Sequence, residues 1–388
     1  MQVDVLIVGG GLAGLSLAQR LEQKGIDYLL LEARDRLGGR ILTKSVGVNG
    51  NTGSFDLGPA WFWPGQPRIA ALVRNFELEV FDQYSAGELT FEDEAGRVVR
   101  GQGFASMEGS LRLAGGMGAL IERLRDCLPS DRIRLDRPVT RLSPEGREIV
   151  ATAEAKDGAK ETINASQVVL AIPPRVAADT IDFLPEMPSK ALKAMRQVPT
   201  WMAGHAKIVA VYERPFWREA GLSGDAMSHR GPMVEIHDAS PPSGGPYALF
   251  GFVGTPPGSR RDNADRLIDL ARVQLGRLFG EQTARPSEIM LQDWAFEPAT
   301  STALDLTPLQ FHPTYGTPRP LANIWEGRLI LASTETAAQF GGYLEGALEA
   351  SDNAFERIKT FLASLPNIAH SEALPLASTT EDTAHTAQ

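Results

Sequence analysis

The sequence predicts an α/β and α+β fold in which a parallel sheet covered by helices is joined to a second, mixed sheet. Three observations indicate this fold: a strand, glycine turn, helix and strand within the first 32 residues, further strand patterns in two separate regions, and an amphipathic helix after the glycine pair 341–342. The chain has 388 residues, 43% of them hydrophobic, which is enough for two domains with cores of their own.

The first unit begins with an apolar run over residues 3–8, short and β-rich as a buried parallel strand should be. Residues 12–24 then carry leucine and alanine at helical spacing, and Gly25 ends this helix. Residues 28–31 predict a second strand, which closes at Glu32. Strand, helix and strand in this order form a βαβ unit.

The turn of this unit carries Gly9, Gly11 and Gly14 in G-x-G-x-x-G spacing. Gly9 permits the tight turn, Gly11 lets a pyrophosphate approach backbone N–H groups at the positive helix end, and Gly14 lets helix and strand pack closely. Glu32 can accept a hydrogen bond from a ribose hydroxyl. Together these residues predict a Rossmann-like domain that binds a dinucleotide.

The stretch "EARDRLGGR" follows at once and extends the predicted cofactor site. Gly38 and Gly39 offer a second turn of bare backbone, and the Arg40 guanidinium suits bidentate phosphate binding. We expect Arg34 of the same stretch to bind the cofactor as well. A plain nicotinamide-binding unit has no need of this second turn.

Residues 6–43 resemble the flavin-binding start of the monoamine oxidase family of flavoproteins, whose cofactor is FAD. The likeness recurs in the same order along the chain, in "FDLGPAWFWPGQPRI", "LAGGMGALIERL", "RPVTRL", "VVLAIPP", "AKIVAVYERPFW" and "LASTETAAQFGGYLEGALEA". It implies a discontinuous FAD-binding domain and a substrate domain with a mixed sheet. We expect the former at 1–75, 111–196 and 318–365, the latter at 76–110 and 197–317, and a disordered tail at 366–388.

Lys207 lies in the strand pattern "HAKIVAVYE", where alternation places it on the same face as Val209 and Val211. If that face is internal, an ammonium sits among apolar neighbours and its pKa falls. The alternative is an edge strand whose lysine reaches solvent. The resemblance favours the first reading, because it implies that Lys207 is the family lysine holding a water at flavin N5.

The closing segment, residues 318–365, predicts a strand, a glycine pair and then a helix with an apolar stripe. The positive end of that helix would stabilise the negative charge that a reduced flavin acquires. By resemblance, the backbone of Val139 lies against the adenine, Thr334 meets the phosphate or ribityl region, and Leu344 offers its N–H to the ring.

The resemblance also implies two aromatic rings beside the flavin, which orient a neutral amine. Tyr343 takes one place, whereas Leu304 stands in the place of the second ring, so we expect Trp61 to supply a pocket wall. Ala303 stands where some members attach flavin through a cysteine, which predicts non-covalent FAD. A long helical insertion common in the family is missing before residue 111, which predicts an open chamber that a bulky substrate or a second subunit of a homo-oligomer could cover.

The activity implied is that of an FAD-dependent amine oxidase: hydride passes from an amine α-carbon to flavin N5, the imine hydrolyses, and dioxygen is reduced to hydrogen peroxide. One alternative is a desaturase or porphyrinogen-oxidase-like enzyme that acts on a non-amine substrate. The other is a flavin-binding partner protein without turnover.

Other classes of function find no support in the sequence. The net charge of −10 argues against a nucleic-acid surface, and no apolar run approaches the roughly 18 residues of a membrane span. The six histidines lack metal-ligand spacing, and only His205, which shares the face of Lys207, merits attention. The single cysteine, Cys127, and the lack of a signal-peptide pattern predict a cytoplasmic protein.

Overall fold

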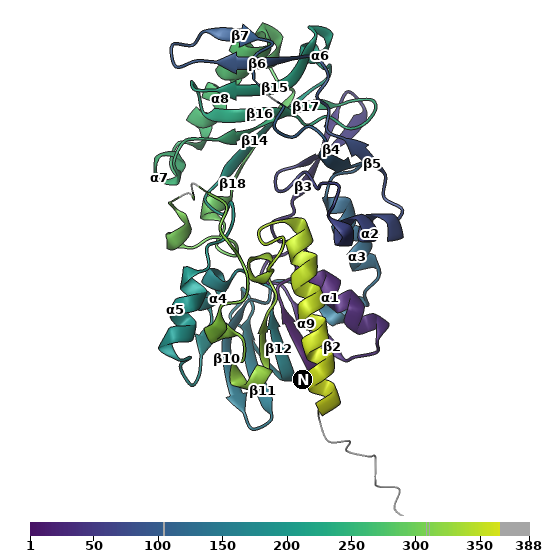
Figure 1. The fold of residues 1–388 in the computed structure, drawn as a ribbon, viewed down its shortest axis with the longest axis vertical. Coiled ribbons are helices and arrows are strands. Elements are labelled where there is room, and N and C mark those ends of the chain that lie inside the picture. The colour runs from purple at the N-terminus through teal and green to yellow at the C-terminus, as the bar shows by residue number, and fades with distance from the viewer. Residues whose placement is uncertain (104, 308, 310, 365–388) are drawn as a thin grey trace, which may run out of the picture.

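The computed structural model describes residues 1–103, 105–307, 309 and 311–364; the predicted disordered tail lies outside this range. Within it, the strands form two large sheets at opposite ends of an elongated molecule (Figure 1). The sheet that contains the N-terminal strand lies at one end, and the sheet built around the lysine strand lies at the other. This arrangement is the one predicted, a helix-flanked sheet joined to a second mixed sheet.

The first sheet has the strand order β13-β10-β11-β12-β1-β2-β9, and β19 also pairs with β12. Strand β1 pairs in parallel with β2 on one side and β12 on the other, and β12 pairs in parallel with β19. The strand bounds are β1 Gln2–Val8, β2 Tyr28–Leu31, β9 Ile133–Arg134, β10 Val139–Glu145, β11 Glu148–Glu154, β12 Lys160–Leu170, β13 Asp182–Phe183 and β19 Leu329–Leu331.

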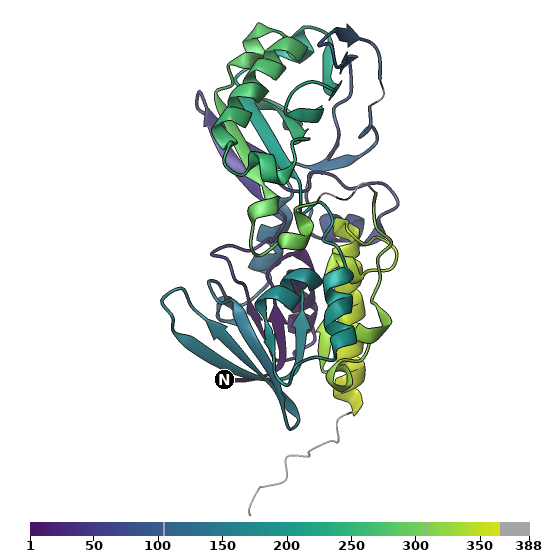
Figure 2. The same ribbon diagram turned by 90° about the vertical axis from the view of Figure 1, so that its left-hand side faces the viewer.

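Helices cover both faces of this sheet. On one face α1 (Leu12–Gln23), α3 (Gly118–Asp126) and α9 (Leu344–Ser364) pack with alternate residues of β1 such as Ile7. On the other face α4 (Pro174–Thr180) and α5 (Ser189–Gln197) pack with the remaining residues, such as Leu6. Helix α2 (Pro67–Asn75) lies against α9. Figure 1 shows α4 and α5 on one side of this sheet and α1 and α9 on the other, and Figure 2 shows the same elongated ribbon turned by 90°.

The second sheet has the order β18-β14-β17-β16-β15-β6-β7, and α8 (Ala264–Phe279) packs on one of its faces. The bounds are β6 Glu88–Glu92, β7 Val98–Arg100, β14 Ala206–Tyr212, β15 Leu222–Ser228, β16 Met233–Asp238, β17 Tyr247–Val253 and β18 Glu288–Asp293. Two short helices, α6 (Phe216–Glu219) and α7 (Pro257–Arg260), connect its strands.

Two short antiparallel strand pairs complete the fold. Strand β3 (Thr43–Val48) pairs with β4 (Asn51–Asp56), and β5 (Val80–Asp82) pairs with β8 (Leu111–Leu113). Phe55 of β4 packs with Val209 and Val211 of β14, so the second sheet rests on this N-terminal segment. The stretch before residue 111, in which no long helical insertion was predicted, contributes β5, β6 and β7. Among the described residues, no helix combines the length and apolar character needed to cross a membrane.

Candidate active site

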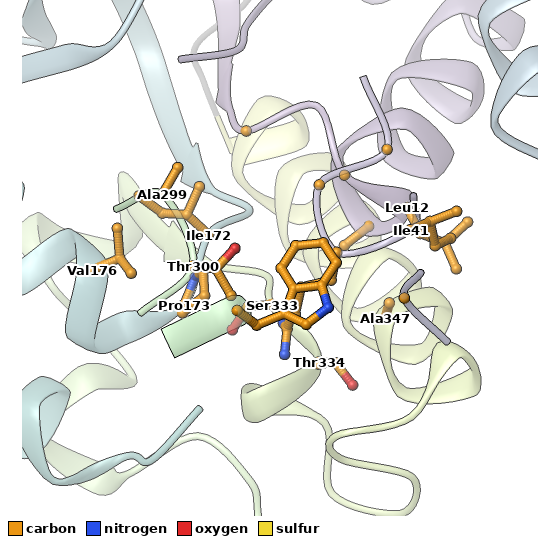
Figure 3. Close-up of a pocket in the computed structure, with 18 of the residues that line it drawn as sticks. Leu12, Ile41, Ile172, Pro173, Val176, Ala299, Thr300, Ser333, Thr334 and Ala347 are labelled. Atoms are coloured by element: carbon orange, nitrogen blue, oxygen red, sulfur yellow. The ribbon is translucent and has the colours of Figure 1, made fainter. Parts of the chain in front are cut away.

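A cavity of about 480 Å³ extends between the two large sheets (Figure 3). Residues of the N-terminal βαβ unit, including Gly9, Gly11 and Glu32, line one part of it. Residues of the second sheet and its connections, including Lys207 and Phe252, line another part. Segments that lie far apart in the sequence therefore form one continuous wall.

The glycine turn presents bare backbone to this cavity. Gly9 has φ +110°, a conformation that favours glycine, and Gly11 precedes α1 without any side-chain cap on the helix N-terminus. A Cβ added at Gly11 would meet nothing closer than 3.9 Å. At Gly14, which is not on the cavity wall, a Cβ would stand 2.0 Å from the Gly9 oxygen. The geometry thus separates a glycine that keeps the wall open from one that lets α1 pack.

Glu32 is fixed at the carboxyl end of β2 by backbone groups. Its side chain is almost fully buried, with Oε2 accepting from the Gly10 N–H at 2.7 Å and Oε1 from the Arg34 N–H at 2.9 Å. Arg34 also lines the cavity, and its guanidinium donates to Thr300 Oγ1 at 2.8 Å. The connection that returns from the second sheet therefore closes over this end of the cavity.

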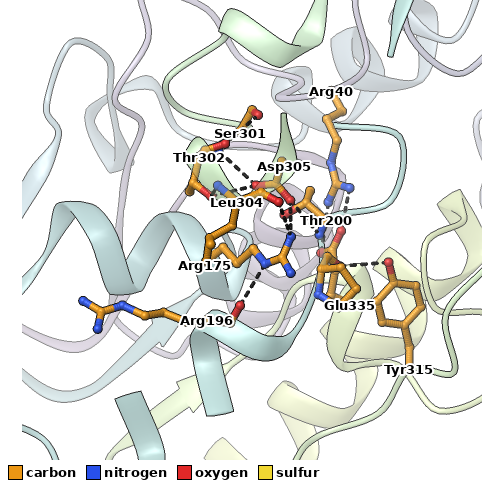
Figure 4. Close-up of polar contacts among 11 residues, drawn as sticks. Arg40, Arg175, Arg196, Thr200, Ser301, Thr302, Leu304, Asp305, Tyr315 and Glu335 are labelled. Carbon is orange, nitrogen blue, oxygen red and sulfur yellow. Dashed lines mark hydrogen bonds and ion pairs between the residues drawn. The ribbon is translucent and has the colours of Figure 1, made fainter. Parts of the chain in front are cut away.

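Arg40 and Glu335 form an ion pair beside the second glycine turn (Figure 4). Arg40 Nη1 lies 2.6 Å from Glu335 Oε1 and Nη2 lies 3.1 Å from Oε2, and the Glu335 side chain is fully buried. A guanidinium carries five N–H donors, so this carboxylate orients Arg40 without using all of them. Both Gly39 and Arg40 line the cavity.

The structure does not bring Leu304 to the cavity. Leu304 is 52% exposed, and it is not among the residues that line the wall. The reason is visible in Figure 4: the carboxylate of its neighbour Asp305 turns inward, where it accepts from Arg175 Nη1 at 2.6 Å and from Thr302 Oγ1 at 2.9 Å. The assignment of Leu304 to the substrate pocket therefore finds no support in the geometry.

Three further predicted positions lie on the cavity wall, one from β10 and two from the closing segment. Val139, Thr334 and Leu344 all line it, and α9 begins at Leu344. Thr334 Oγ1 donates to the Tyr343 carbonyl at 2.7 Å, which fixes the turn that enters the helix. Next to it, the buried Ser333 hydroxyl lines the cavity and has no hydrogen-bond partner among the described residues.

Lys207 is a buried residue of an interior strand. Strand β14 pairs with β17 and β18, so the edge-strand alternative is wrong, and Lys207 is only 3% exposed. Its Nζ donates to the Gly58 carbonyl at 3.1 Å and lies 3.8 Å from the centroid of the Phe250 ring. Burial lowers the pKa of Lys207 to about 7, against the opposing attraction of Asp56.

A hydrogen bond and aromatic contacts hold Trp61 in the cavity wall. Its Nε1–H donates to Gln83 Oε1 at 2.8 Å, and its ring lies 5.1 Å from Phe250 and 5.2 Å from His237. Behind it, His237 contacts Asp225 through Nδ1 at 2.7 Å and Glu235 through Nε2 at 3.0 Å. Burial opposes charge on the His237 ring, but these hydrogen bonds raise its pKa.

Tyr343 lies at the cavity rim and is 39% exposed. Its ring stacks on His312, with centroids 5.1 Å apart and planes 21° apart, and meets the edge of Trp63 at 6.0 Å. His312 also contacts Trp201, with ring centroids 4.7 Å apart. Tyr343, Trp61 and Lys207 thus line the same cavity, as do Gly9, Gly11, Glu32, Arg34, Gly38 and the other predicted cofactor residues except Gly14.

Other residues of the site carry no sequence signal. Trp201, Met202, Phe252 and Trp294 line the cavity, and His312 covers one face of Tyr343. Trp201 and Met202 come from the turn before β14, Phe252 comes from β17, and Trp294 comes from the return after β18. His205 does line the cavity, and its buried Nδ1 has no hydrogen-bond partner among the described residues.

These features fit a dinucleotide cofactor. Bare backbone at Gly11, an uncapped helix N-terminus and a buried carboxylate at Glu32 suit a diphosphate and a ribose. The unpartnered Ser333 hydroxyl offers a further polar contact. No group of three or more His, Cys, Asp or Glu side chains suited to a metal occurs in the described part of the chain.

The fold and the cavity together define a protein with a Rossmann-like dinucleotide-binding unit and a second, mixed sheet. The sequence profile described as "NAD(P)-binding Rossmann-like domain" matches residues 7–76, and that described as "Flavin containing amine oxidoreductase" matches residues 86–358. The chain belongs to the flavin-containing amine oxidoreductase family. The predicted family and fold class are confirmed.

Individual relatives are distant but similar along almost the whole chain. Flavin-containing amine oxidase B of Sus scrofa is 24% identical, covering 94% of this chain and 87% of its own, and amine oxidase A of Sus scrofa is 25% identical, covering 94% and 86%. Among solved structures, putrescine oxidase bound to putrescine matches with a TM-score of 0.76 at 20% identity, covering 93% of this chain and 99% of that one. Cyclohexylamine oxidase from Brevibacterium oxydans IH-35A matches with a TM-score of 0.76 at 21% identity and the same coverage.

Proposed function

We propose that this protein is an FAD-dependent amine oxidase that converts an amine to an imine and reduces dioxygen to hydrogen peroxide. The observation that carries the proposal is the single cavity that joins the dinucleotide motif to an apolar chamber containing Lys207. When bound, FAD supplies the electron acceptor for this chemistry. The amine is the small-molecule partner and dioxygen the second substrate.

The residues of the N-terminal unit would hold FAD without a covalent bond. The N–H groups at the start of α1 and the backbone of Gly11 meet the diphosphate, and Glu32 meets a ribose. Cys127 is the only cysteine of the sequence, it is exposed, and it lies outside the cavity wall, so no thiol is placed to form a thioether.

The residues of the second sheet would bind the amine and exclude water. Oxidation at the α-carbon needs the nitrogen lone pair, so a site for this reaction should favour the neutral amine. The wall around Trp61 and Phe252 is apolar and disfavours an ammonium. Lys207 Nζ, with a pKa of about 7, can hold or release a proton at physiological pH beside the reacting groups.

An anaerobic mixing experiment tests the proposal. The yellow protein is mixed with a panel of amines and of non-amine donors while the flavin absorption band is followed. We expect rapid bleaching by an amine and recovery of the band with peroxide formation when oxygen is admitted. Bleaching by non-amine donors alone would replace the proposal with the desaturase-like activity, and no bleaching by any donor would leave a flavin-binding protein without turnover.

A variant of Lys207 tests the role proposed for this residue. Lys207→Met should keep the flavin and slow its reoxidation by oxygen, because the proton-holding group of the chamber is lost. Lys359→Met changes a half-exposed lysine on α9 that pairs with Glu356, and it serves as the control. Reoxidation of Lys207→Met at the rate of the control would contradict the role given to this side chain.

A further inference from the structure

His205 lies on the cavity wall two residues before Lys207, at the entrance to β14. Because side chains alternate along a strand, both residues point to the same face, and both line the cavity. The backbone of His205 is fixed on both sides. Its N–H donates to the Met202 carbonyl at 3.1 Å, and its carbonyl accepts from the Trp294 N–H at 3.0 Å. The turn before β14 and the return after β18 therefore set the position of the imidazole.

The two ring nitrogens of His205 differ in their surroundings. Nδ1 is covered by the protein and has no hydrogen-bond partner among the described residues. Because Nδ1 is covered, Nε2 is the nitrogen through which this ring can meet a molecule in the cavity. The Met202 carbonyl favours a proton on the ring. A neutral imidazole carries one proton, and a proton on Nδ1 leaves the lone pair of Nε2 free to accept a hydrogen bond.

The surroundings of His205 disfavour a second proton on its ring. Lys207 follows on the same strand face, and Arg260 of α7 lies beside the turn, where its Nη2 donates to the carbonyl of residue 204 at 2.6 Å. Arg260 is in turn paired with Asp293 of β18, with Nε 2.6 Å from Oδ2. Burial and then the positive charge of Arg260 lower the pKa of His205, against the opposing effect of a backbone carbonyl. The ring is therefore neutral at pH 7.

Neighbouring side chains offer an amine N–H no comparable acceptor. Trp201 carries an indole that only donates, and Met202 carries a thioether that accepts weakly. Lys207 Nζ is already engaged, because it donates to the Gly58 carbonyl at 3.1 Å and lies 3.8 Å from the centroid of an aromatic ring of β17, a contact that favours its positive charge. Among the described residues that line the cavity, Glu32 is the only carboxylate, and both of its oxygens accept backbone N–H groups at the dinucleotide end.

We propose that His205 is a substrate-binding residue whose Nε2 accepts a hydrogen bond from an N–H group of the neutral amine. This inference rests on the proposed function for the identity of the ligand. An amine that donates an N–H to the imidazole keeps its own nitrogen lone pair free, and oxidation at the α-carbon needs that lone pair. A doubly protonated ring has no lone pair to offer, so the neutral state of His205 belongs to the site.

The test is a binding measurement with an amine that cannot react. The probe, 1,1,1-trifluoro-2-methylheptan-2-amine, has no hydrogen on the carbon that carries nitrogen, so its affinity is read without turnover. Its trifluoromethyl group withdraws electrons and lowers the pKa of the amine well below that of an alkylamine, so the neutral form prevails near pH 7. The FAD-loaded unchanged protein, His205→Leu and His205→Gln are titrated calorimetrically with this probe at pH 5 and pH 8. Flavin absorption and urea unfolding verify that each variant is folded and loaded.

We expect His205→Leu to bind the probe about fivefold more weakly than the unchanged protein at pH 8, or worse, because one hydrogen bond is lost. His205→Gln keeps an acceptor in its amide oxygen and should recover part of this loss. At pH 5 the unchanged protein should lose its advantage over His205→Leu, because its ring gains a proton, whereas His205→Gln should keep its advantage. His229→Leu, which changes an exposed histidine outside the cavity wall, is the matched control and should bind as the unchanged protein does.

Three results would overturn the inference. The first is equal affinity of the unchanged protein and His205→Leu at pH 8, which is expected if the chamber holds an ammonium on its aromatic faces. The second is an advantage over His205→Leu that is as large at pH 5 as at pH 8. The third is a failure of the unchanged protein to bind the probe, since the proposed acceptor would then hold no neutral amine.

Heptan-2-amine separates these failures from a failure of the proposed function. It has a hydrogen in place of the trifluoromethyl group, so it can react, and it is mixed anaerobically with the same proteins. Flavin reduction by heptan-2-amine together with probe affinities that do not depend on His205 would preserve the amine oxidase and refute the acceptor. The expected pattern of probe affinities without flavin reduction by any amine would refute the oxidase and preserve the acceptor.

Discussion

Alanine at two glycines of the N-terminal unit should affect different properties, FAD binding at Gly11 and the free energy of unfolding at Gly14. At Gly11 the backbone is extended, with φ −78° and ψ −176°, and an added Cβ meets nothing within 3.9 Å. The apo-protein should therefore fold, losing less than about 1 kcal/mol at this helix N-cap. The methyl group would stand where a diphosphate must approach the backbone, and overpacking of about 1–3 kcal/mol corresponds to a roughly 5- to 150-fold weaker Kd for FAD.

At Gly14 the expected result is reversed. The added Cβ would lie 2.0 Å from the Gly9 oxygen, so α1 and the turn must separate before the chain can fold. Gly14→Ala should lower the free energy of unfolding of the apo-protein by about 1–3 kcal/mol. Gly258→Ala is the matched control, because Gly258 has open space around it and no positive φ.

The assay combines urea unfolding of the apo-protein with FAD titration followed by quenching of flavin fluorescence. Gly11→Ala should shift the titration and leave the unfolding curve nearly unchanged, whereas Gly14→Ala should shift the unfolding curve. FAD binding to Gly11→Ala within a factor of two of the unchanged protein would refute the reasoning, because the cofactor would then not approach this backbone.

Three further variants test buried charges. The folded state releases the proton of Lys207 near pH 7 and the unfolded chain near 10.5, so the stability of the unchanged protein should gain up to about 1.4 kcal/mol per pH unit between these values. Urea unfolding of Lys207→Met at pH 7 and 9 should lack this gain, and an equal slope in both proteins would contradict it. The raised pKa of His237 means that its stabilisation is complete below pH 6.5 and is lost as the pH rises through the folded value. His237→Asn should therefore be destabilised more at pH 6 than at pH 9 in thermal unfolding, and a constant difference would count against the charged ring. Arg175→Met leaves the buried Asp305 carboxylate without its cation and should cost about 3–5 kcal/mol in urea unfolding, much of which Asp305→Asn in the same chain should restore; a cost below 1 kcal/mol would refute the pairing.

Local patterns were sufficient for the N-terminal unit and for the face of Lys207. Strand, glycine spacing and helix are encoded within 32 residues, and β1, α1 and β2 occur as predicted. The alternation that joined Lys207 to Val209 and Val211 holds as well, because side chains of a strand point to the two faces in turn. Such features depend on residues near one another in the sequence.

Other parts of the site depend on contacts between distant segments, which a single sequence does not encode visibly. Glu335, which orients Arg40, lies 295 positions away, and no spacing pairs the two. Leu304 points outward next to the buried carboxylate of Asp305, although the family resemblance implies a place in the pocket for that leucine. Trp201 lies on the cavity wall in the turn before β14, where Met202 adopts a left-handed conformation. No sequence pattern predicts this turn.

The most direct test of the whole account is the flavin content of the purified protein. We predict a yellow protein with one FAD per chain, and denaturation should release that FAD completely into the supernatant, since no cysteine lies at the cavity. A colourless protein that fails to bind added FAD would contradict the assignment of the cavity. Flavin that stays attached to the denatured chain would contradict its non-covalent binding.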